Sequence, residues 1–269
     1  MSNKVLKPKK ASLYQFTQKY SNNIDNCIEF FKSMKWPEGF SCDRCGCHKY
    51  YLVKRVGKTK TSYVLECSSC HKQHSLLSGT IFQSCKLDLY KLLLGIFLFF
   101  NKNKGISAVD LCSILDVNYK TALLLENKCR ILMSLSNSDK LLNSLFYEAD
   151  VFNIGAKSKN KAGRASGQQP ILGILSTDKE NNYPRFIKLR LITDYTGLSL
   201  KKNIEKCCVL SHDALFNTDG EKGFNTLNEE IQVKNEKISY EEKDHRLLWL
   251  NIIIGNIKNN ITGIYHGIT

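Results

Sequence analysis

Four cysteines near the N-terminus are the residues of this chain best spaced to bind a metal. Cys42 and Cys45 form one C-x2-C pair, and Cys67 and Cys70 form a second pair, separated from the first by 21 residues. Each pair can present two thiolates from one tight turn, and two such turns complete the tetrahedral four-sulfur shell that Zn2+ prefers. The sequence therefore predicts a structural zinc site; iron in place of zinc, or four unliganded buried cysteines, are the alternatives.

The other cysteines show no such pattern. Three side chains close to the pairs could replace one of the thiolates, although we expect them at the surface: Cys47, His48 and His71. The remaining six cysteines are expected to be small core residues: Cys27, Cys85, Cys112, Cys129, Cys207 and Cys208. The basic start, Met1–Lys10, has no apolar segment of a secretory signal, so we expect reduced thiols and a cytoplasmic protein.

Two aspartates lie in segments that are expected to form strands. Asp150 lies within Phe146–Gly155, and Asp219 ends Leu215–Asp219. Acidic residues at the ends of neighbouring strands can jointly hold two Mg2+ ions, an arrangement that suits in-line phosphoryl transfer. Taken alone the pair is weak evidence, because an Asp-Gly sequence such as that at Asp219 is usually a turn.

The chain is strongly basic, with 39 Lys and Arg against 25 Asp and Glu and a formal charge of +14. Residues 1–60 hold 13 of the basic and four of the acidic residues, so this quarter is the expected contact for a polyanion. The basic side chains expected to contact DNA are Lys54, Arg55, Lys58 and Lys60, and tyrosines are interleaved with them. A ribbon that contacts DNA phosphates needs such a pattern. A solvated basic face is the alternative.

The elements that must position these residues follow from the hydrophobic pattern. Apolar residues at helical spacing predict one helix over 12–35, ended by Trp36–Gly39. Over 40–85, paired cysteines, glycines and β-prone runs at Lys49–Val53 and Thr61–Leu65 predict a small β-ribbon.

Helix formers dominate from Lys86 to about Ser136, and breaks at 101–105 and 116–118 predict three helices. The most apolar run, Leu87–Phe100, falls short of the roughly 20 residues that a membrane span needs. We therefore expect a buried helix there and no membrane contact.

Residues 105–125 have the form of a helix-turn-helix, with Val117 filling the turn. The exposed start of the second helix could reach base edges or phosphates. The residues there are Asn118, Tyr119, Lys120 and Thr121. A plain helical spacer has the same periodicity and is the alternative.

After Asn137 the pattern changes to short β-rich runs. It predicts three strands over 145–154, 171–176 and 186–192, a helix over 196–208, a fourth strand over 214–218 and a final helix over 245–261. Residues 220–243 are charged and are expected to be irregular. We therefore expect a multidomain α+β protein that ends in an α/β domain. Its predicted domains are an N-terminal helix (1–39), a zinc ribbon (40–85), a helix-turn-helix segment (86–140) and an α/β catalytic domain (141–269).

Several blocks, taken in order along nearly the whole chain, resemble a known family. The chain looks like the bacterial insertion-sequence transposases of the ISXO-like group, which have an N-terminal zinc ribbon and an RNase H-like catalytic domain of DDE type. The blocks are Trp36–Cys45, Cys67–Cys70 running into Leu77–Phe82, the helix-turn-helix stretch, Glu148–Asp150, Asn217–Gly220, and Ile254–Lys258 running into Gly263–Gly267.

The resemblance implies hydrolysis at element ends and attack of the freed 3′-hydroxyl on target DNA. Asp150 and Asp219 match the first two metal-binding carboxylates of the family. Asn256 matches the third position, where other DDE enzymes have Glu, and Lys258 and His266 close by could stabilise charge on the phosphate. Two Mg2+ or Mn2+ ions, double-stranded DNA at element ends and target, a homo-oligomer on DNA and a location at the bacterial nucleoid are implied in the same way.

The chain departs from the family pattern at three places. Val151 stands where the family commonly has an acidic residue, and the usual Gly-rich basic turn appears as Lys161–Gly167. Lys161 and Arg164 in that turn are expected to face DNA, although such charge runs are often only solvated. Relatives usually continue beyond the position of Thr269, so we expect a truncated catalytic domain.

Two other function classes fit the same residues. One is a catalytically inactive, decayed transposase or DNA-binding regulator that keeps the N-terminal half. The other is a zinc-ribbon transcription factor whose C-terminal half is an interaction domain. Dependence of strand transfer on Asp150 and Asp219 separates the transposase from both.

Overall fold

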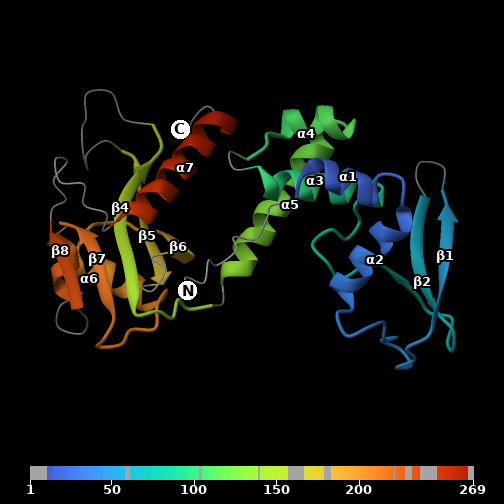
Figure 1. Cartoon of the computed structure of the whole chain (residues 1–269), viewed down its shortest axis with the longest axis horizontal. Coiled ribbons are helices and arrows are strands. Elements are labelled where there is room, and N and C mark those ends of the chain that lie inside the picture. Colours follow the sequence, from blue (N-terminus) through green and yellow to red (C-terminus); the bar gives the residue numbers. More distant parts are fainter. Residues whose placement is uncertain are drawn as a thin grey trace, which may run out of the picture. The chain divides into compact units, whose positions relative to one another are not determined.

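The computed structural model of the chain describes residues 11–57, 61–102, 105–138, 140–156, 167–178, 183–220, 222–227, 232–236 and 247–265. Contacts divide the chain into two compact units, Met1–Met133 and Ser134–Thr269. Figure 1 draws the N-terminal unit in blue to green and the C-terminal unit in yellow-green to red. The predicted helix, ribbon and helix-turn-helix segment belong to the first unit, where they share one hydrophobic core.

The N-terminal unit begins with two helices, α1 (Leu13–Tyr20) and α2 (Ile24–Lys35). One helix over 12–35 was therefore the wrong prediction. The break arises because the Asn23 side chain accepts a hydrogen bond from the backbone N–H of Asn26 and so caps a new helix. Both helices bury their apolar side in the same core.

The ribbon is a three-stranded antiparallel sheet in the order β1-β2-β3. Its strands are β1 (Tyr50–Val56), β2 (Thr61–Cys67) and β3 (Gln73–Ser75). The first two confirm the predicted pair and are longer than expected, whereas β3 is too short to have a sequence signal. The inner strand β2 is the most buried of the three.

Three helices follow, as predicted: α3 (Leu89–Asn101), α4 (Ala108–Leu115) and α5 (Tyr119–Ser138), the last of which continues past Met133 into the C-terminal unit. The apolar helix α3 lies in the core, and among the described residues no helix is long and apolar enough to span a membrane. Between α4 and α5 the backbone of Asp116 is left-handed, with φ 50°. Val117 packs against the core, and its carbonyl accepts a hydrogen bond from the Cys112 thiol at 2.8 Å.

The C-terminal unit is built on a mixed five-stranded sheet in the order β6-β5-β4-β7-β8. Strands β4, β5 and β6 form an antiparallel meander, and β4, β7 and β8 run parallel to one another. The elements are β4 (Phe146–Ile154), β5 (Gln169–Asp178), β6 (Tyr183–Leu191), α6 (Gly197–Glu205), β7 (Leu215–Asp219), the 3-10 helix η2 (Lys222–Leu227), β8 (Gln232–Glu236) and α7 (Leu248–Tyr265).

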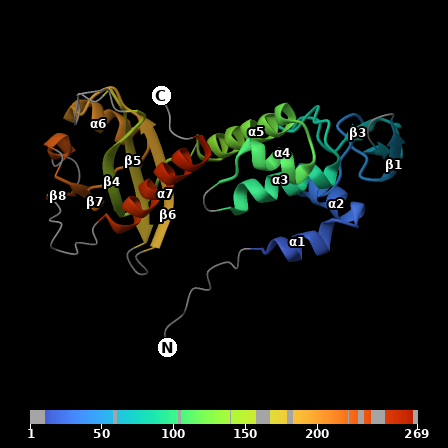
Figure 2. The same ribbon diagram turned by 90° about the horizontal axis from the view of Figure 1, so that it is seen from above.

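Each face of this sheet has its own core. Tyr147 and Ala149 of β4 point to the face covered by α6 and η2, where Leu200 of α6 is fully buried. Phe152 of β4 and Leu175 of β5 point to the opposite face, against α7. In Figure 2, α7 lies across the sheet on one side and α6 lies on the other. Alternate residues of β4 therefore serve the two faces, which we name the α6 face and the α7 face.

The strand β8 contradicts the prediction that residues 220–243 are irregular. Its five residues pair in parallel with β7, from Leu215 opposite Gln232 to Asp219 opposite Glu236. Backbone pairing at a sheet edge places few demands on side chains, so a polar sequence such as Gln-Val-Lys-Asn-Glu can form a strand without an apolar pattern.

Tyr147 tests the packing of the α6 face. Its side chain is fully buried, its hydroxyl donates to the Leu142 carbonyl at 3.1 Å, and the Ser144 N–H donates to that hydroxyl at 2.8 Å. Tyr147→Phe leaves two backbone groups without this partner and should lower the free energy of unfolding by about 1–3 kcal/mol. Urea denaturation measures it. Tyr183→Phe, at a tyrosine that is 40% exposed on β6, should change it by less than about 0.5 kcal/mol.

Candidate functional site

The four cysteines of the two pairs come together at one end of the ribbon. Their sulfur atoms all lie within 4.8 Å of one another. The Cys42 and Cys70 sulfurs are 3.6 Å apart, and the Cys45 and Cys67 sulfurs are 3.5 Å apart. A tetrahedral zinc site with Zn–S bonds of about 2.3 Å has sulfurs about 3.8 Å apart. The spacing therefore fits a four-thiolate zinc site, as the sequence predicts.

The two turns that carry these thiolates have the same backbone geometry. The residue after each pair is left-handed, Gly46 with φ 70° and His71 with φ 54°. In each turn that residue donates its N–H to the carbonyl of the first cysteine, Gly46 to Cys42 at 2.8 Å and His71 to Cys67 at 3.1 Å. Glycine adopts this conformation without strain and histidine does not. The second turn thus holds a strained residue for the sake of the metal geometry.

Hydrogen bonds at the first turn favour the thiolate form that zinc requires. Burial raises the pKa of the Cys42 thiol, but hydrogen bonds with the backbone N–H groups of Arg44 and Cys45 and with the side chains of His74 and Cys70 together outweigh it and lower the pKa from 9.0 to about 6. The pKa values of Cys45 and Cys67 are raised instead: backbone N–H groups of Cys47 and Cys70 lower them, but side-chain hydrogen bonds with other cysteines of the cluster, together with burial, raise them more. A bound cation removes this conflict, since it stabilises all four negative charges at once.

The three possible substitute ligands are engaged elsewhere. The Cys47 sulfur lies 3.5 Å from the Ser68 hydroxyl, His48 Nδ1 lies 3.0 Å from the Phe40 carbonyl, and His71 Nδ1 lies 3.3 Å from Glu66. Sequence reasoning missed His74, which is buried on β3 and hydrogen-bonds Cys42. A single histidine on a three-residue strand carries no spacing signal that could have found it.

The two predicted aspartates lie on neighbouring parallel strands of the C-terminal unit. Ala149 of β4 stands opposite Thr218 of β7, so Asp150 and Asp219 are the next residues along the two strands. Ala149 and Thr218 are buried, and the residues that follow them point to the other face, which is the α7 face. Adjacent strands are about 4.8 Å apart, a separation at which two carboxylates can share metal ions.

Gly173 of β5 makes room beside this pair. It stands opposite Asp150, and a side-chain carbon at Gly173 would lie 3.3 Å from Leu250 of α7. Helix α7 thus packs closely over β4 and β5 next to Asp150.

A buried carboxylate joins β4 to this helix. Glu148 is 3% exposed, and its Oε2 accepts the backbone N–H of Leu250, in the first turn of α7, at 2.7 Å. Burial raises the pKa of Glu148 to about 7, although hydrogen bonds from the Leu250 and Trp249 N–H groups lower it in part. Glu148 and Asp150 lie on the same face of β4, two residues apart.

The side chains of α7 separate into two flanks. Trp249 and Lys258 are nine residues apart and so leave the helix on opposite sides, at about 100° per residue. The Trp249 ring is 6.1 Å from that of Tyr183 on β6, whereas Lys258 Nζ is 5.8 Å from the centre of the Phe152 ring on β4. The Trp249 flank therefore faces β6, and the Lys258 flank faces β4.

This division separates two asparagines. Asn256, the predicted third ligand, follows Trp249 by seven residues and shares its flank, whereas Asn251 precedes Lys258 by seven residues and lies on the flank of Lys258. Both asparagines are exposed. The sequence alone does not separate the two, because the phase of α7 can be read only when its buried side is known. His266 lies outside the described residues.

The predicted DNA contacts are partly described. Lys54 and Arg55 are exposed on the edge strand β1, and Tyr119 and Lys120 are exposed at the start of α5. The side-chain Oδ1 of Asn118 accepts the Thr121 N–H at 2.8 Å and the Thr121 hydroxyl at 2.9 Å, so the Asn118 side chain caps the helix. Four predicted contacts lie outside the described residues: Lys58, Lys60, Lys161 and Arg164.

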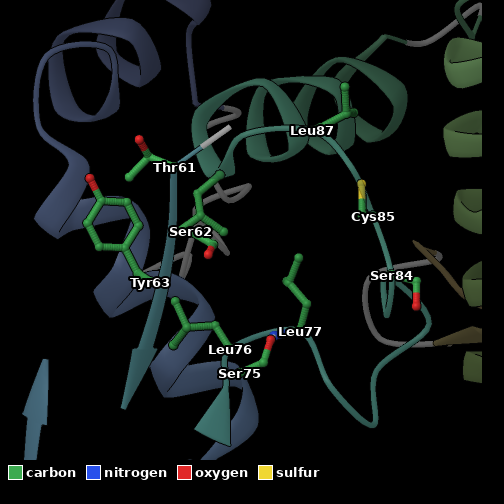
Figure 3. Close-up of a pocket in the computed structure, with 10 residues that line it drawn as sticks. Thr61, Ser62, Tyr63, Ser75, Leu76, Leu77, Ser84, Cys85 and Leu87 are labelled. Carbon is green, nitrogen blue, oxygen red and sulfur yellow. The ribbon is translucent and has the colours of Figure 1, made fainter. Parts of the chain in front are cut away.

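A small pocket beside the ribbon has different chemistry. It has a volume of about 130 Å3, and Figure 3 shows hydroxyl groups of Thr61, Ser62 and Tyr63 on one side and Ser84 with Cys85 on the other. Its lining residues include no carboxylate, imidazole or amine. It therefore lacks the groups for metal binding or for acid–base catalysis at neutral pH.

Comparison with known families gives two matches. Residues 23–73 match the transposase zinc-ribbon domain, and residues 145–269 match the ISXO2-like transposase domain. The first covers the four-cysteine cluster, and the second covers the mixed sheet with Asp150, Asp219 and α7. No curated protein matches the chain at a significant level.

The zinc site predicts the outcome of metal removal. The purified chain should contain one zinc ion, and chelation should unfold the ribbon, because so small a sheet depends on metal binding for much of its folding free energy. Metal analysis measures the zinc content. The fluorescence of Trp36, which packs against Phe40 and His74, reports the unfolding of the ribbon. Cys67→Ala should lose the zinc, and its neighbour variant Cys47→Ala should retain it; zinc loss in Cys47→Ala would show that the ligand set is wrong.

Proposed function

Since the chain belongs to the ISXO2-like transposases with an N-terminal zinc-ribbon domain, we propose that it binds the ends of an insertion sequence and catalyses strand cleavage and strand transfer there. The observation that carries this proposal is the placement of Asp150 and Asp219 side by side on parallel strands. The strand order, an antiparallel meander of three with two parallel strands at one side, supports an RNase H-like catalytic core.

In this proposal Asp150 and Asp219 are the protein ligands that hold divalent ions at the substrate phosphate. Two Mg2+ or Mn2+ ions, when bound, activate the attacking water or 3′-hydroxyl and stabilise the charge on the phosphate. Asp150 and Asp219 would hold these ions jointly, because they lie next to each other on adjacent strands. The two strands hold the carboxylates in fixed positions, because β4 and β7 are hydrogen-bonded to each other and are not loops.

The third ligand is proposed to come from the Lys258 flank of α7. Asn251 lies on that flank and faces β4, whereas the predicted Asn256 faces β6. An amide oxygen ligates Mg2+ without adding negative charge. Lys258, on the same flank as Asn251, supplies a cation that can stabilise charge on the phosphate.

DNA recognition is proposed to lie in the N-terminal unit. Tyr119 and Lys120 are exposed in the first turn of α5, the position from which a recognition helix reads the major groove. Lys54 and Arg55 on the ribbon are proposed to contact phosphates, which would give binding a strong salt dependence. A complex that joins two element ends would require a homo-oligomer.

The catalytic proposal predicts a loss of strand transfer in two variants. Asp150→Asn and Asp219→Asn should each lower the rate by about 100-fold or more, since the charge stabilisation that the metals supply is worth several kcal/mol and 1.4 kcal/mol is tenfold. The assay uses element-end DNA with Mg2+ or Mn2+. The matched control is Asp178→Asn, on β5 of the same sheet, where the carboxylate pairs with Arg185; it should stay within about threefold of wild type. Unchanged rates in both site variants would refute the proposal.

The two asparagines give a separate prediction. Asn251→Ala should lower strand transfer by at least about tenfold, and Asn256→Ala should change it by less than about twofold, because their flanks differ. Asn251→Asp should shift the Mn2+ dependence to lower concentration, since it adds a negative charge to the site. The reverse pattern would restore Asn256 as the third ligand.

A further inference from the structure

Glu148 is a buried carboxylate that the proposed chemistry does not use. Its partners are backbone N–H groups of Trp249 and Leu250, about a hundred residues away in the sequence. The first N–H groups of a helix have no partner within the helix, and they carry partial positive charge. No acidic side chain lies in the first turn of α7 itself, so β4 supplies the hydrogen-bond acceptor from the sheet beneath the helix.

Apolar packing leaves the rotation of α7 poorly defined. Leu250 and Ile254 are buried against Phe152 and Leu175. Apolar residues also occupy the opposite side of the helix, where Leu248 is 37% exposed and Ile252 is 45% exposed. Hydrophobic burial is not directional, and either side could cover the sheet. A directional contact is needed to select one.

The hydrogen bond from Leu250 to Glu148 is directional and fixes both the height and the rotation of the helix. A slip by one residue along α7 would rotate its side chains by about 100°. Lys258 would then leave the ring of Phe152, and Asn251 would no longer face β4. Because Glu148 lies two residues before Asp150 on the same face of the same strand, the bond ties the position of α7 directly to the proposed metal ligands.

We propose that Glu148 is a positioning residue, which docks the first turn of α7 on β4 so that Asn251 and Lys258 face Asp150 and Asp219. This inference rests on the proposed function, since it assigns those four residues to one site. Glu148 itself contacts neither metal nor DNA in this assignment.

The experiment measures the docking of α7 and metal binding separately, in the zinc-loaded full chain. Hydrogen exchange of the Leu250 amide reports the docking, and titration with Mn2+ alone, followed by electron paramagnetic resonance, reports metal affinity. The variants are Glu148→Leu, which removes the acceptor, and Glu148→Gln, which keeps an acceptor oxygen at the same reach. Glu205→Leu, at an exposed residue that ends α6, is the control.

Glu148→Leu should speed exchange at Leu250 by at least about tenfold, in line with the loss of a buried hydrogen bond that leaves its donor without a partner. It should also weaken Mn2+ binding by at least about fivefold. Glu148→Gln should restore both values to within about threefold of wild type, and Glu205→Leu should match wild type. The same order should appear in the rate of strand transfer.

Two results would overturn the proposal. One is exchange at Leu250 that stays slow in Glu148→Leu, and the other is faster exchange with unchanged Mn2+ affinity, which would leave Glu148 with a structural role alone. If Glu148→Leu does not fold, Glu148→Asp replaces it, because it keeps the charge but is one methylene shorter; unchanged Mn2+ affinity in that variant again overturns the proposal. Failure of the proposed function is distinguishable, since it appears as strand transfer that does not need Asp150 in an otherwise unaltered chain.

Discussion

The parallel pairing of β4 with β7 is the interaction on which the proposed active site depends. Tyr147 stands opposite Phe216, with their rings stacked at 4.4 Å, and Ala149 stands opposite Thr218, all on the buried α6 face. A shift of either strand by one residue would turn these side chains to the other face and bury an aspartate in their place. The hydrophobic core of the α6 face therefore holds two acidic residues next to each other on the α7 face, although it touches neither of them.

The N-terminal unit depends on a different kind of constraint. Its ribbon is small, and the four sulfurs at one end are held at distances that satisfy a cation better than they satisfy one another. Helices α1, α2 and α3 share one hydrophobic core with the ribbon, and this core includes Cys42 and Cys67. Metal binding therefore stabilises more than the turns that supply the ligands. Metal binding also holds the ribbon, and with it the exposed basic side chains of β1, in a defined position.

The sequence predicted those features that depend on local spacing. The zinc ligands follow from two C-x2-C pairs, and the carboxylate pair follows from aspartates in two segments that form neighbouring strands. Features that depend on backbone groups far away in the sequence were missed. The hydrogen-bond partner of Glu148 is a backbone amide of α7, and β8 forms by pairing with the edge of β7. The sequence could not show which flank of α7 carries Asn256 and which carries Asn251 for a related reason, because apolar residues surround most of α7 and its phase is set by a contact with β4. The resemblance to a family did not supply this phase either.

The charges of the proposed site bear on when it can bind metal. Two carboxylates and one neutral amide carry a charge of −2, whereas two Mg2+ ions carry +4, and Lys258 adds a further positive charge on the same side. The protein alone therefore leaves the second ion poorly compensated, and the phosphate groups of bound DNA supply the missing negative charge. On this argument full metal occupancy follows DNA binding.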